Sequence, residues 1–239
     1  MITFAIMKQE PDFSAGVFDA TGSMIDCKSI GRKALLPLLI CEFMPLLSLA
    51  GNTELELLRA INTDRNPFFD GFFKVITDSA PVLSFMIPAL LIVFLLVTGN
   101  KQQALTALIA GVSVGIAALI STILKFWIDR PRPFITYEFI EKLSVGGSPS
   151  FPSGHTTDAF ALAIVLALMF RKWWVIVPLF LWAALVGYSR MHLGVHYPSD
   201  VGAGMVIGLL AGGLSFVGLK RVISWGRLAN YIPGSSSKK

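Results

Sequence analysis

The chain has 239 residues, of which 54% are hydrophobic and 15% are charged, whereas about 25% are charged in a typical soluble domain. So much apolar surface excludes a disordered chain, a disulfide scaffold and an ordinary soluble enzyme. The net charge of +5 does not indicate a nucleic-acid partner, because the cations lie between apolar runs rather than along one polar face. Cys27 and Cys41 form neither a metal-binding pattern nor a disulfide framework. We therefore expect a membrane protein.

The first apolar run, at 34–50, follows a polar segment at 1–33 and predicts the first membrane span. Basic residues before the run and small residues at 48–50 leave a cleaved signal peptide as the alternative. The next segment, 53–80, alternates apolar residues with acids and amides and is broken by Pro67. It predicts two short amphipathic helices at the membrane surface, with an ordered soluble loop as the alternative.

Five further apolar runs approach or reach the roughly 20 residues that cross the hydrocarbon core. They lie at 79–98, 104–124, 156–170, 173–188 and 201–219. With the first run they predict an all-α integral membrane bundle of six helices at 34–220, in which the amphipathic helices lie between spans one and two. Small residues four positions apart predict close helix packing. These residues are Gly111 and Gly115, and then Gly204, Gly208 and Gly212.

An even number of spans places both termini on the same side of the membrane. The loops on that side carry more Lys and Arg than the opposite loops, as at Lys101 and Arg171-Lys172. This asymmetry predicts cytoplasmic segments at 1–33 and 221–239. The short chain and compact loops favour a bacterial plasma membrane, and nothing in the sequence indicates the oligomeric state.

Polar residues gather at span ends in three clusters, which run from Lys125 to Pro133, from Pro152 to His155 and from Ser189 to Asp200. Because helix direction alternates, all three clusters meet on the face opposite to the termini. Taken singly, each has an ordinary explanation as a snorkelling anchor, a helix cap, an interfacial histidine or a first-turn acid. Their convergence instead favours a functional site on the extracytoplasmic face.

Three cations in one compact site suit a phosphoryl group. Arg132 and Arg190 can each offer two parallel donors to phosphate oxygens, and Lys125 adds a point charge. Ser153 and Gly154, at the start of a helix, add a hydroxyl and free backbone N–H groups. The pattern predicts a phosphate-binding site.

Two histidines can divide the work of phosphate hydrolysis, since one can attack phosphorus while the other protonates the leaving oxygen. Asp200 follows His196 by four residues, so the two would share a face if the stretch were helical. A carboxylate there would hold the far nitrogen of the imidazole and stabilise its positive charge. We therefore predict that His196 is the nucleophile, His155 the acid and Asp200 the orienting group.

The three clusters resemble the three-part signature of the type 2 phosphatidic acid phosphatase family, which that family shares with vanadium haloperoxidases. The matching positions are Lys125, Arg132-Pro133, Pro152-Ser153-Gly154-His155, Ser189-Arg190, His196 and Asp200, in this order and at the family's spacing. The resemblance covers about residues 50 to 220 and implies a six-helix membrane phosphatase that acts on lipid phosphates or pyrophosphates without a metal or other cofactor. It implies the same roles for the two histidines and the aspartate. It also implies phosphate-binding roles for Lys125, Arg132, Ser153, Gly154 and Arg190.

The substrate stays open among undecaprenyl pyrophosphate, phosphatidylglycerol phosphate, phosphatidic acid and the phosphates of lipid A. We expect specificity to lie in the segments at 53–80 and 136–150, near the mouth of the site. A vanadate-dependent haloperoxidase and a non-enzymatic lipid-phosphate carrier are the alternatives to a lipid phosphatase.

Four residues near the signature have no fixed place in it. His192 lies in a spacer, where contact with the substrate headgroup is one possibility. Asp158 either tunes His155, one helical turn away, or is a solvated first-turn acid. Asp129 and Arg130 only flank the first part of the signature.

Overall fold

The computed structural model of the chain describes residues 51–229, with side chains described over 54–224. The predicted first span at 34–50 lies outside the described residues, and so does the polar segment before it. The chain divides into two units, Met1–Leu57 and Leu58–Lys239. The arrangement described below is that of the second unit.

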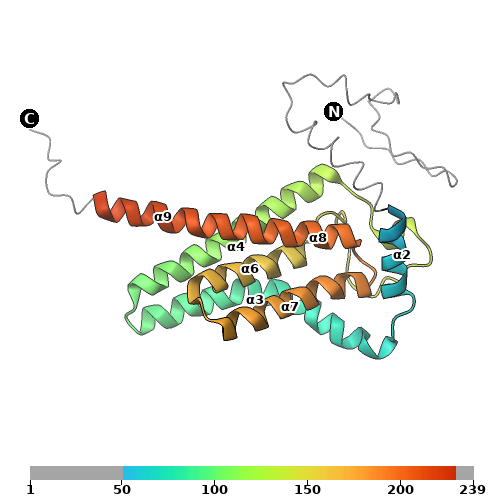
Figure 1. Cartoon of the computed structure of the whole chain (residues 1–239), viewed down its shortest axis with the longest axis horizontal. Helices are drawn as coiled ribbons and strands as arrows, with labels where there is room; N and C mark the ends of the chain where they lie inside the picture. Colours follow the sequence, from blue (N-terminus) through green and yellow to red (C-terminus); the bar gives the residue numbers. More distant parts are fainter. Residues whose placement is uncertain (1–50, 230–239) are drawn as a thin grey trace, which may run out of the picture. The chain divides into compact units, whose positions relative to one another are not determined.

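Every regular element in the described part of the chain is helical (Figure 1). The elements are α2 (Gly51–Asn62), η2 (Pro67–Phe69), α3 (Asp70–Val97), α4 (Lys101–Ile128), α5 (Pro133–Thr136), α6 (Gly154–Phe170), α7 (Trp173–His192), α8 (Pro198–Ile207), η3 (Gly208–Gly212) and α9 (Gly213–Ala229). The all-α class is therefore confirmed for these residues. Four of the five later apolar runs coincide with α3, α4, α6 and α7, and the run at 201–219 extends over α8, η3 and α9.

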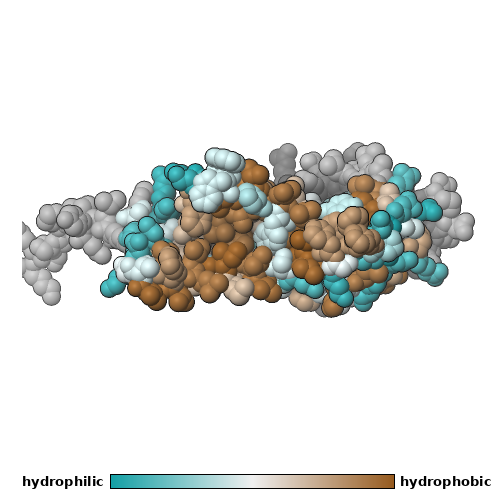
Figure 2. Space-filling view, turned by 90° about the horizontal axis from the view of Figure 1, so that it is seen from below, coloured by the Kyte–Doolittle hydropathy of each residue, from teal (hydrophilic) through white to brown (hydrophobic). Residues whose placement is uncertain are grey.

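Four of these helical stretches are long and apolar enough to cross a membrane. They are Pro67–Val97, Lys101–Thr136, Trp173–His192 and Pro198–Ser224. Helix α6 is apolar but shorter, with 17 residues. Large hydrophobic side chains point outward from the bundle, and Figure 2 shows a broad hydrophobic surface with hydrophilic residues gathered toward its two ends. Such a surface fits a protein whose solvent is lipid.

The segment around Pro67 differs from the prediction. One short helix, α2, is present, but the second expected amphipathic helix is the beginning of α3, which runs without a break from Asp70 to Val97. Pro67 starts the single turn η2, where a missing N–H costs nothing, and the Asn66 side chain accepts a hydrogen bond from the N–H of Phe68 at 3.0 Å. Pro67 therefore opens the turn that leads into α3, and the helix after it is the long α3 and not a second short helix.

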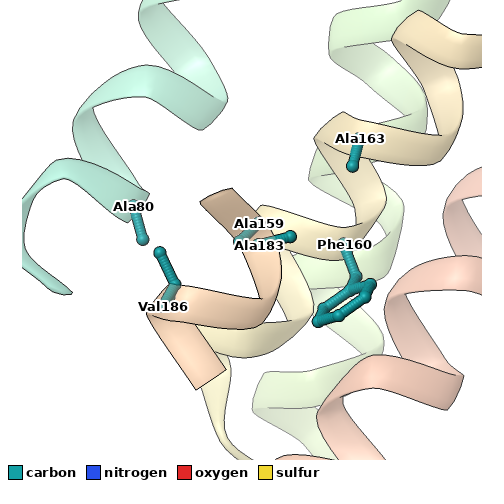
Figure 3. Packing of buried hydrophobic residues seen from close by; sticks show 6 residues of the cluster. All are labelled: Ala80, Ala159, Phe160, Ala163, Ala183 and Val186. Carbon is teal, nitrogen blue, oxygen red and sulfur yellow. The ribbon is translucent and has the colours of Figure 1, made fainter. Parts of the chain in front are cut away.

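Helix α6 is surrounded by its neighbours. One buried cluster joins it to α3 and α7 (Figure 3) and consists of Ala80, Ala159, Phe160, Ala163, Ala183 and Val186. A second joins it to α4 and consists of Val114, Ala117, Ala161, Leu162 and Leu166. A third adds α9 and consists of Ile109, Ala110, Val165 and Phe216. An apolar helix that is covered on all sides belongs to the core, so the N-terminus of α6 is held among the ends of the other helices.

Glycines allow the last helix to approach α6 closely. A Cβ atom would lie 2.7 Å from the carbonyl oxygen of Ser153 if placed on Gly204, and 2.5 Å from that of Thr157 if placed on Gly208. At Gly212 it would lie 3.1 Å from Cα of Ala161. The predicted packing role is confirmed for these three glycines. It is wrong for Gly115, where a Cβ would meet nothing within 4 Å.

Candidate active site

The three predicted polar clusters meet where α4 and α7 end and α6 and α8 begin. The backbone N–H of Ser153 donates to the carbonyl oxygen of Asp200 at 3.0 Å. The backbone N–H of Ser150 donates to the carbonyl oxygen of Arg130 at 2.7 Å, and Lys125 Nζ donates to that of Pro149 at 2.9 Å. These hydrogen bonds join residues that lie between 20 and 47 positions apart in the sequence.

Asp200 reaches His196 in a different way from the one predicted. Helix α8 begins at Pro198, so His196 precedes the helix and the two residues do not share a helical face. Instead the Asp200 carboxylate, in the first turn, folds back over the helix start and accepts a hydrogen bond from the N–H of Tyr197 at 2.9 Å. Its Oδ2 then lies 3.4 Å from Nδ1 of His196. The predicted pair is present, but its geometry comes from a helix cap.

The His196 imidazole is buried and is held in its neutral form. Burial, together with the positive charges of Arg190 and Arg132, lowers the pKa of His196 to about 3, although Asp200 acts in the opposite direction. With Asp200 beside Nδ1, the proton of the neutral ring belongs on that nitrogen. Nε2 then keeps its lone pair, and this atom lies 3.5 Å from Nη1 of Arg132.

Arg132 is fixed by neutral oxygens. Its Nε donates to the carbonyl oxygen of Ser148 at 2.7 Å, and its Nη1 donates to that of Val195 at 2.9 Å. Gly146 makes room for the guanidinium, because a Cβ there would lie 2.8 Å from Nη1. The predicted loop at 136–150 therefore wraps the arginine and holds it at the site.

The other two predicted cations are also bound to uncharged groups. Arg190 is 2% exposed and donates from Nη1 to the hydroxyl of Thr77 at 2.6 Å, while its Nε has no hydrogen-bond partner among the described residues. Lys125 is half-buried beside the carbonyl of Pro149. Within 51–229, none of Lys125, Arg132 and Arg190 forms an ion pair with a carboxylate. Among the described residues, these three positive charges therefore have no bound counter-charge.

The start of α6 presents its backbone to the same cations. Ser153 occupies the N-cap position, but its side chain does not cap the helix N–H groups. Its hydroxyl is instead hydrogen-bonded to the hydroxyl of Thr156 at 2.8 Å. The first N–H groups of α6 are thus left without a side-chain cap. A Cβ on Gly154 would meet nothing within 4 Å, so there is open space at the helix start. This is the arrangement that binds anions at helix N-termini.

His155 follows directly in the first turn of α6 and is half-buried. Burial, together with the charges of Arg190, His196, Lys125 and Arg132, lowers the pKa of His155 to about 3. The structure therefore brings all eight predicted site residues to one end of the bundle, although their roles stay predictions.

Two residues without a predicted role contact Asp200. Arg130 donates from Nη1 to Oδ1 of Asp200 and to the hydroxyl of Ser199, both at 2.7 Å. The hydroxyl of Ser150 donates to Oδ2 of Asp200. For Arg130 the sequence carries a weak signal, the run Asp-Arg-Pro-Arg-Pro at 129–133. For Ser150 it carries none.

His192 lies outside this cluster. Its Nε2 is 2.9 Å from Oδ1 of Asp70, and its ring centroid is 4.5 Å from that of Phe73. With Tyr188 it lines a cavity of about 430 Å³ whose other walls come from residues 60–73. The segment expected to set specificity therefore does border a cavity, but contact of His192 with a headgroup stays a prediction.

Asp158 is not a freely solvated acid. Its Oδ1 is buried and has no hydrogen-bond partner among the described residues, and the charge of Lys125 acts on it. No hydrogen bond between Asp158 and His155 is found in this part of the chain, so tuning of that histidine stays a prediction.

The chain resembles known proteins over most of the described region. A family model, the PAP2 superfamily, matches residues 106–224. Undecaprenyl-diphosphatase BcrC of Bacillus subtilis is 34% identical over 164 residues, which are 67% of this chain and 81% of the relative. Lipid A 4'-phosphatase of Bacteroides thetaiotaomicron is 31% identical over 171 residues, which are 68% of this chain and 75% of the relative.

Two solved structures also resemble it. The crystal structure of Aquifex aeolicus LpxE has 35% sequence identity and a TM-score of 0.57, and the match covers 68% of this chain and 94% of that one. The first transmembrane PAP2 type phosphatidylglycerolphosphate phosphatase from Bacillus subtilis has 26% identity and a TM-score of 0.59, with 77% of this chain and 95% of that one covered.

Proposed function

The chain belongs to the PAP2 superfamily, and we propose that it is an integral membrane phosphatase that releases the terminal phosphate of a lipid phosphate or lipid pyrophosphate through a phosphohistidine intermediate. One observation carries the proposal. Lys125, Arg132 and Arg190 surround two histidines and, within the described residues, have no carboxylate partner. Such charges are costly to hold away from water unless an anion joins them. A phosphoryl group supplies two negative charges and several acceptor oxygens.

In the first step the lone pair of His196 Nε2 attacks phosphorus. The bond between phosphorus and the leaving oxygen breaks, and that oxygen takes a proton from His155, whose protonated form the negative charge of the bound phosphate favours. The Asp200 carboxylate, with Oδ2 at 3.4 Å from Nδ1, stabilises the positive charge that develops on the imidazole. The products of this step are the phosphohistidine and the lipid alcohol, or the shortened lipid phosphate when the substrate is a pyrophosphate.

In the second step a water molecule attacks the phosphohistidine. His155, now neutral, takes a proton from this water, and the bond between phosphorus and Nε2 breaks. Inorganic phosphate leaves and His196 recovers its lone pair. During both steps the equatorial oxygens stay with the three cations and the first N–H groups of α6, which stabilise the charge of the transition state.

The reaction we propose uses no metal ion. In many phosphatases a metal stabilises the phosphoryl oxygens. Here fixed guanidinium and ammonium groups supply positive charge at the place where the metal ions would act. Arg132 and Arg190 are held by hydrogen bonds before substrate arrives, so little reorganisation is needed when the charge develops.

The lipid nature of the substrate is inferred from the surface and from the relatives. The site lies at the ends of apolar helices whose outward faces are hydrophobic, so a phosphate on a membrane lipid reaches it directly. The relatives are named as phosphatases of undecaprenyl diphosphate, lipid A and phosphatidylglycerophosphate. We propose that this chain acts on one member of this chemical class.

We further propose six spans with cytoplasmic termini and an extracytoplasmic site. Single cysteines at Lys101 and at Gly147, in a chain from which Cys27 and Cys41 have been removed, provide the test. A membrane-impermeant thiol reagent added to intact cells should label the cysteine at 147 and not the one at 101. The reverse pattern would contradict the orientation.

Phosphate release and trapping of the intermediate test the proposed reaction. Purified protein in detergent micelles is given a panel of lipid mono- and pyrophosphates, and released phosphate is measured. With ³²P-labelled substrate, an alkaline quench should retain label on the protein and mild acid should remove it, as expected for phosphohistidine. The His196→Ala variant should neither turn over nor trap label. Turnover by that variant would overturn the assignment of the nucleophile.

Vanadate distinguishes the alternative functions. As a phosphate analogue it should inhibit phosphate release competitively. Oxidation of halide in the presence of vanadate and peroxide would support a haloperoxidase instead. Movement of labelled lipid phosphate across vesicles by the His196→Ala variant, without hydrolysis by the parent protein, would support a carrier.

A further inference from the structure

We propose that Arg130 and Ser150 are positioning residues that hold Asp200 as a fixed carboxylate behind His196. The inference rests on the proposed function, because it concerns the group that orients the proposed nucleophile. Neither residue belongs to the predicted phosphate-binding set.

The Asp200 carboxylate is fully buried and receives donors from three stretches of chain. Oδ1 accepts from Arg130 at 2.7 Å, and Oδ2 accepts from the hydroxyl of Ser150 and from the N–H of Tyr197 at 2.9 Å. A carboxylate oxygen has about two lone-pair sites, so Oδ2 is already saturated. Nδ1 of His196 lies 3.4 Å from this oxygen and has no hydrogen-bond partner among the described residues.

This saturation decides what Asp200 can do. Hydrogen bonds to the ionised form stabilise it, so Asp200 stays a carboxylate and has little tendency to take the proton of His196. The proton therefore remains on Nδ1, and Nε2 keeps the lone pair that attacks phosphorus. The clamp keeps the imidazole in the reactive tautomer without making Asp200 a base.

Arg130 and Ser150 also bind each other, which makes the clamp a closed ring. The N–H of Ser150 donates to the carbonyl oxygen of Arg130 at 2.7 Å, and both side chains then meet on Asp200. The guanidinium of Arg130 lies 3.8 Å from the centroid of the Tyr197 ring. Tyr197 is the residue that follows His196 in the sequence. Arg130 thus ties the loop after α4 to the loop that carries His196.

Two arginines separated by one proline therefore have different tasks. Arg132 binds neutral carbonyl oxygens and keeps its positive charge uncompensated for a phosphate. Arg130 binds a carboxylate, so its charge is already neutralised. Loss of Arg130 should then leave the phosphate site intact and alter only the state of His196.

Several other charged or titratable groups among the described residues act on this pair and contribute to its pH dependence. These groups are Lys125 of α4, Arg130 and Arg132 of the following loop, His155 of α6, Arg190 of α7, and Tyr197. Removing the positive charge of Arg130 leaves the Asp200 anion less compensated and favours the protonated form of His196. The acid limb of the kcat/KM profile should then move to higher pH.

The test compares Arg130→Gln, Arg130→Lys and Ser150→Ala with the exposed-residue controls Arg221→Gln and Ser224→Ala. We expect kcat to fall about 10- to 100-fold in Arg130→Gln, the loss typical when the group that orients a functional histidine is removed. KM should stay within about twofold of the parent value. The pKa of the acid limb of the kcat/KM profile should rise by a measurable fraction of a pH unit. Arg130→Lys should restore the acid limb, since it keeps the charge, and should recover part of kcat. Ser150→Ala should show the same changes as Arg130→Gln, only smaller.

Several outcomes would overturn the inference. A rise in KM alone would make Arg130 a phosphate ligand, and a loss of kcat with an unchanged pH profile would give it a purely structural role. Unchanged kinetics in Ser150→Ala would also count against it, and this variant decides the matter if Arg130→Gln does not fold. Imidazole ¹⁵N chemical shifts of His196 separate this inference from the proposed function. They should report an Nδ1 proton in the parent protein and a raised pKa in Arg130→Gln whether or not the protein turns over lipid phosphate.

Discussion

Two polar clusters lie near the C-terminal end of α7, and they are built on opposite electrostatic plans. Around His192, the charges are paired: Arg65 binds both Asp70 and Glu141, and Asp70 also binds His192. Around His196, the cations Lys125, Arg132 and Arg190 bind neutral oxygens. Paired charges hold segments together, whereas buried unpaired charges of one sign require a ligand. The comparison therefore separates a structural network from a binding site, although each contains a buried histidine next to an aspartate.

The largest difference is expected between the two histidines. His196→Ala should lower kcat by about 10⁴-fold or more, since it removes the proposed nucleophile. His192→Asn, which keeps a hydrogen-bonding side chain beside Asp70, should lower kcat by less than about tenfold. Phosphate release from a lipid phosphate, with both variants at matched purity and fold by circular dichroism, provides the measurement. Equal losses in the two variants would remove the basis of the comparison.

The arginines of the two clusters should differ next. Arg132→Gln and Arg190→Gln should each lower kcat/KM about 10- to 100-fold, because a hydrogen bond to a charged group contributes about 1.5–3 kcal/mol. Arg65→Gln should instead lower the Tm by a few degrees, because it releases Asp70 and Glu141 from the network that Arg65 joins. Its effect on kcat/KM should be smaller than that of either cation variant. Thermal unfolding and steady-state kinetics on the same samples distinguish the two patterns. A stable Arg65→Gln variant as inactive as Arg190→Gln would show that the paired network also serves the reaction.

Acid should weaken the fold through His196. The pKa of His196 is about 3 in the folded chain and about 6.5 when unfolded, so between these values the unfolded chain binds the extra proton. Stability is therefore lost as the pH falls below about 6.5, by on the order of 2 kcal/mol from this group at pH 5. His196→Gln lacks this loss, so its Tm should decline less than that of the parent between pH 7.5 and pH 5. Parallel declines would show that His196 is not held neutral by burial.

The smallest expected effect is that of metal removal. Because fixed cations occupy the site, treatment with EDTA followed by gel filtration should leave kcat unchanged within error. Full loss of activity, restored by a divalent cation, would contradict the metal-independent reaction. Added Mg²⁺ could raise the activity on anionic micelles only by binding to the micelle surface. Spermidine is the control for this effect, because it also binds to that surface but does not act as a Lewis acid.

The membrane helices were predictable because length and composition suffice for them. The five later apolar runs are helical, with the last one continuing through α8, η3 and α9, since no other structure except a closed barrel satisfies the backbone inside hydrocarbon. The start of α3 was not predictable from Pro67 alone. A proline can either end a helix or open one. Here Asn66 caps the turn that Pro67 begins, and α3 follows directly after that turn.

The site was predictable as a set of residues and only partly as a geometry. Spacing identified the eight residues that meet at one end of the bundle. It did not show that His196 precedes α8 and that Asp200 reaches it by folding back over the helix start. Arg130 and Ser150 escaped because a side chain's partner in a loop depends on how that loop packs against another.

The sequence by itself therefore determined the solvent of this protein, its helices and the chemical groups available for a phosphate. Those properties follow from local composition and from short spacings along the chain. Only the tertiary structure decided which of two neighbouring arginines, Arg130 or Arg132, is neutralised by Asp200 and which keeps its charge. The physical reason is that charge compensation depends on distances across the fold, between residues about 70 positions apart, which no local pattern records.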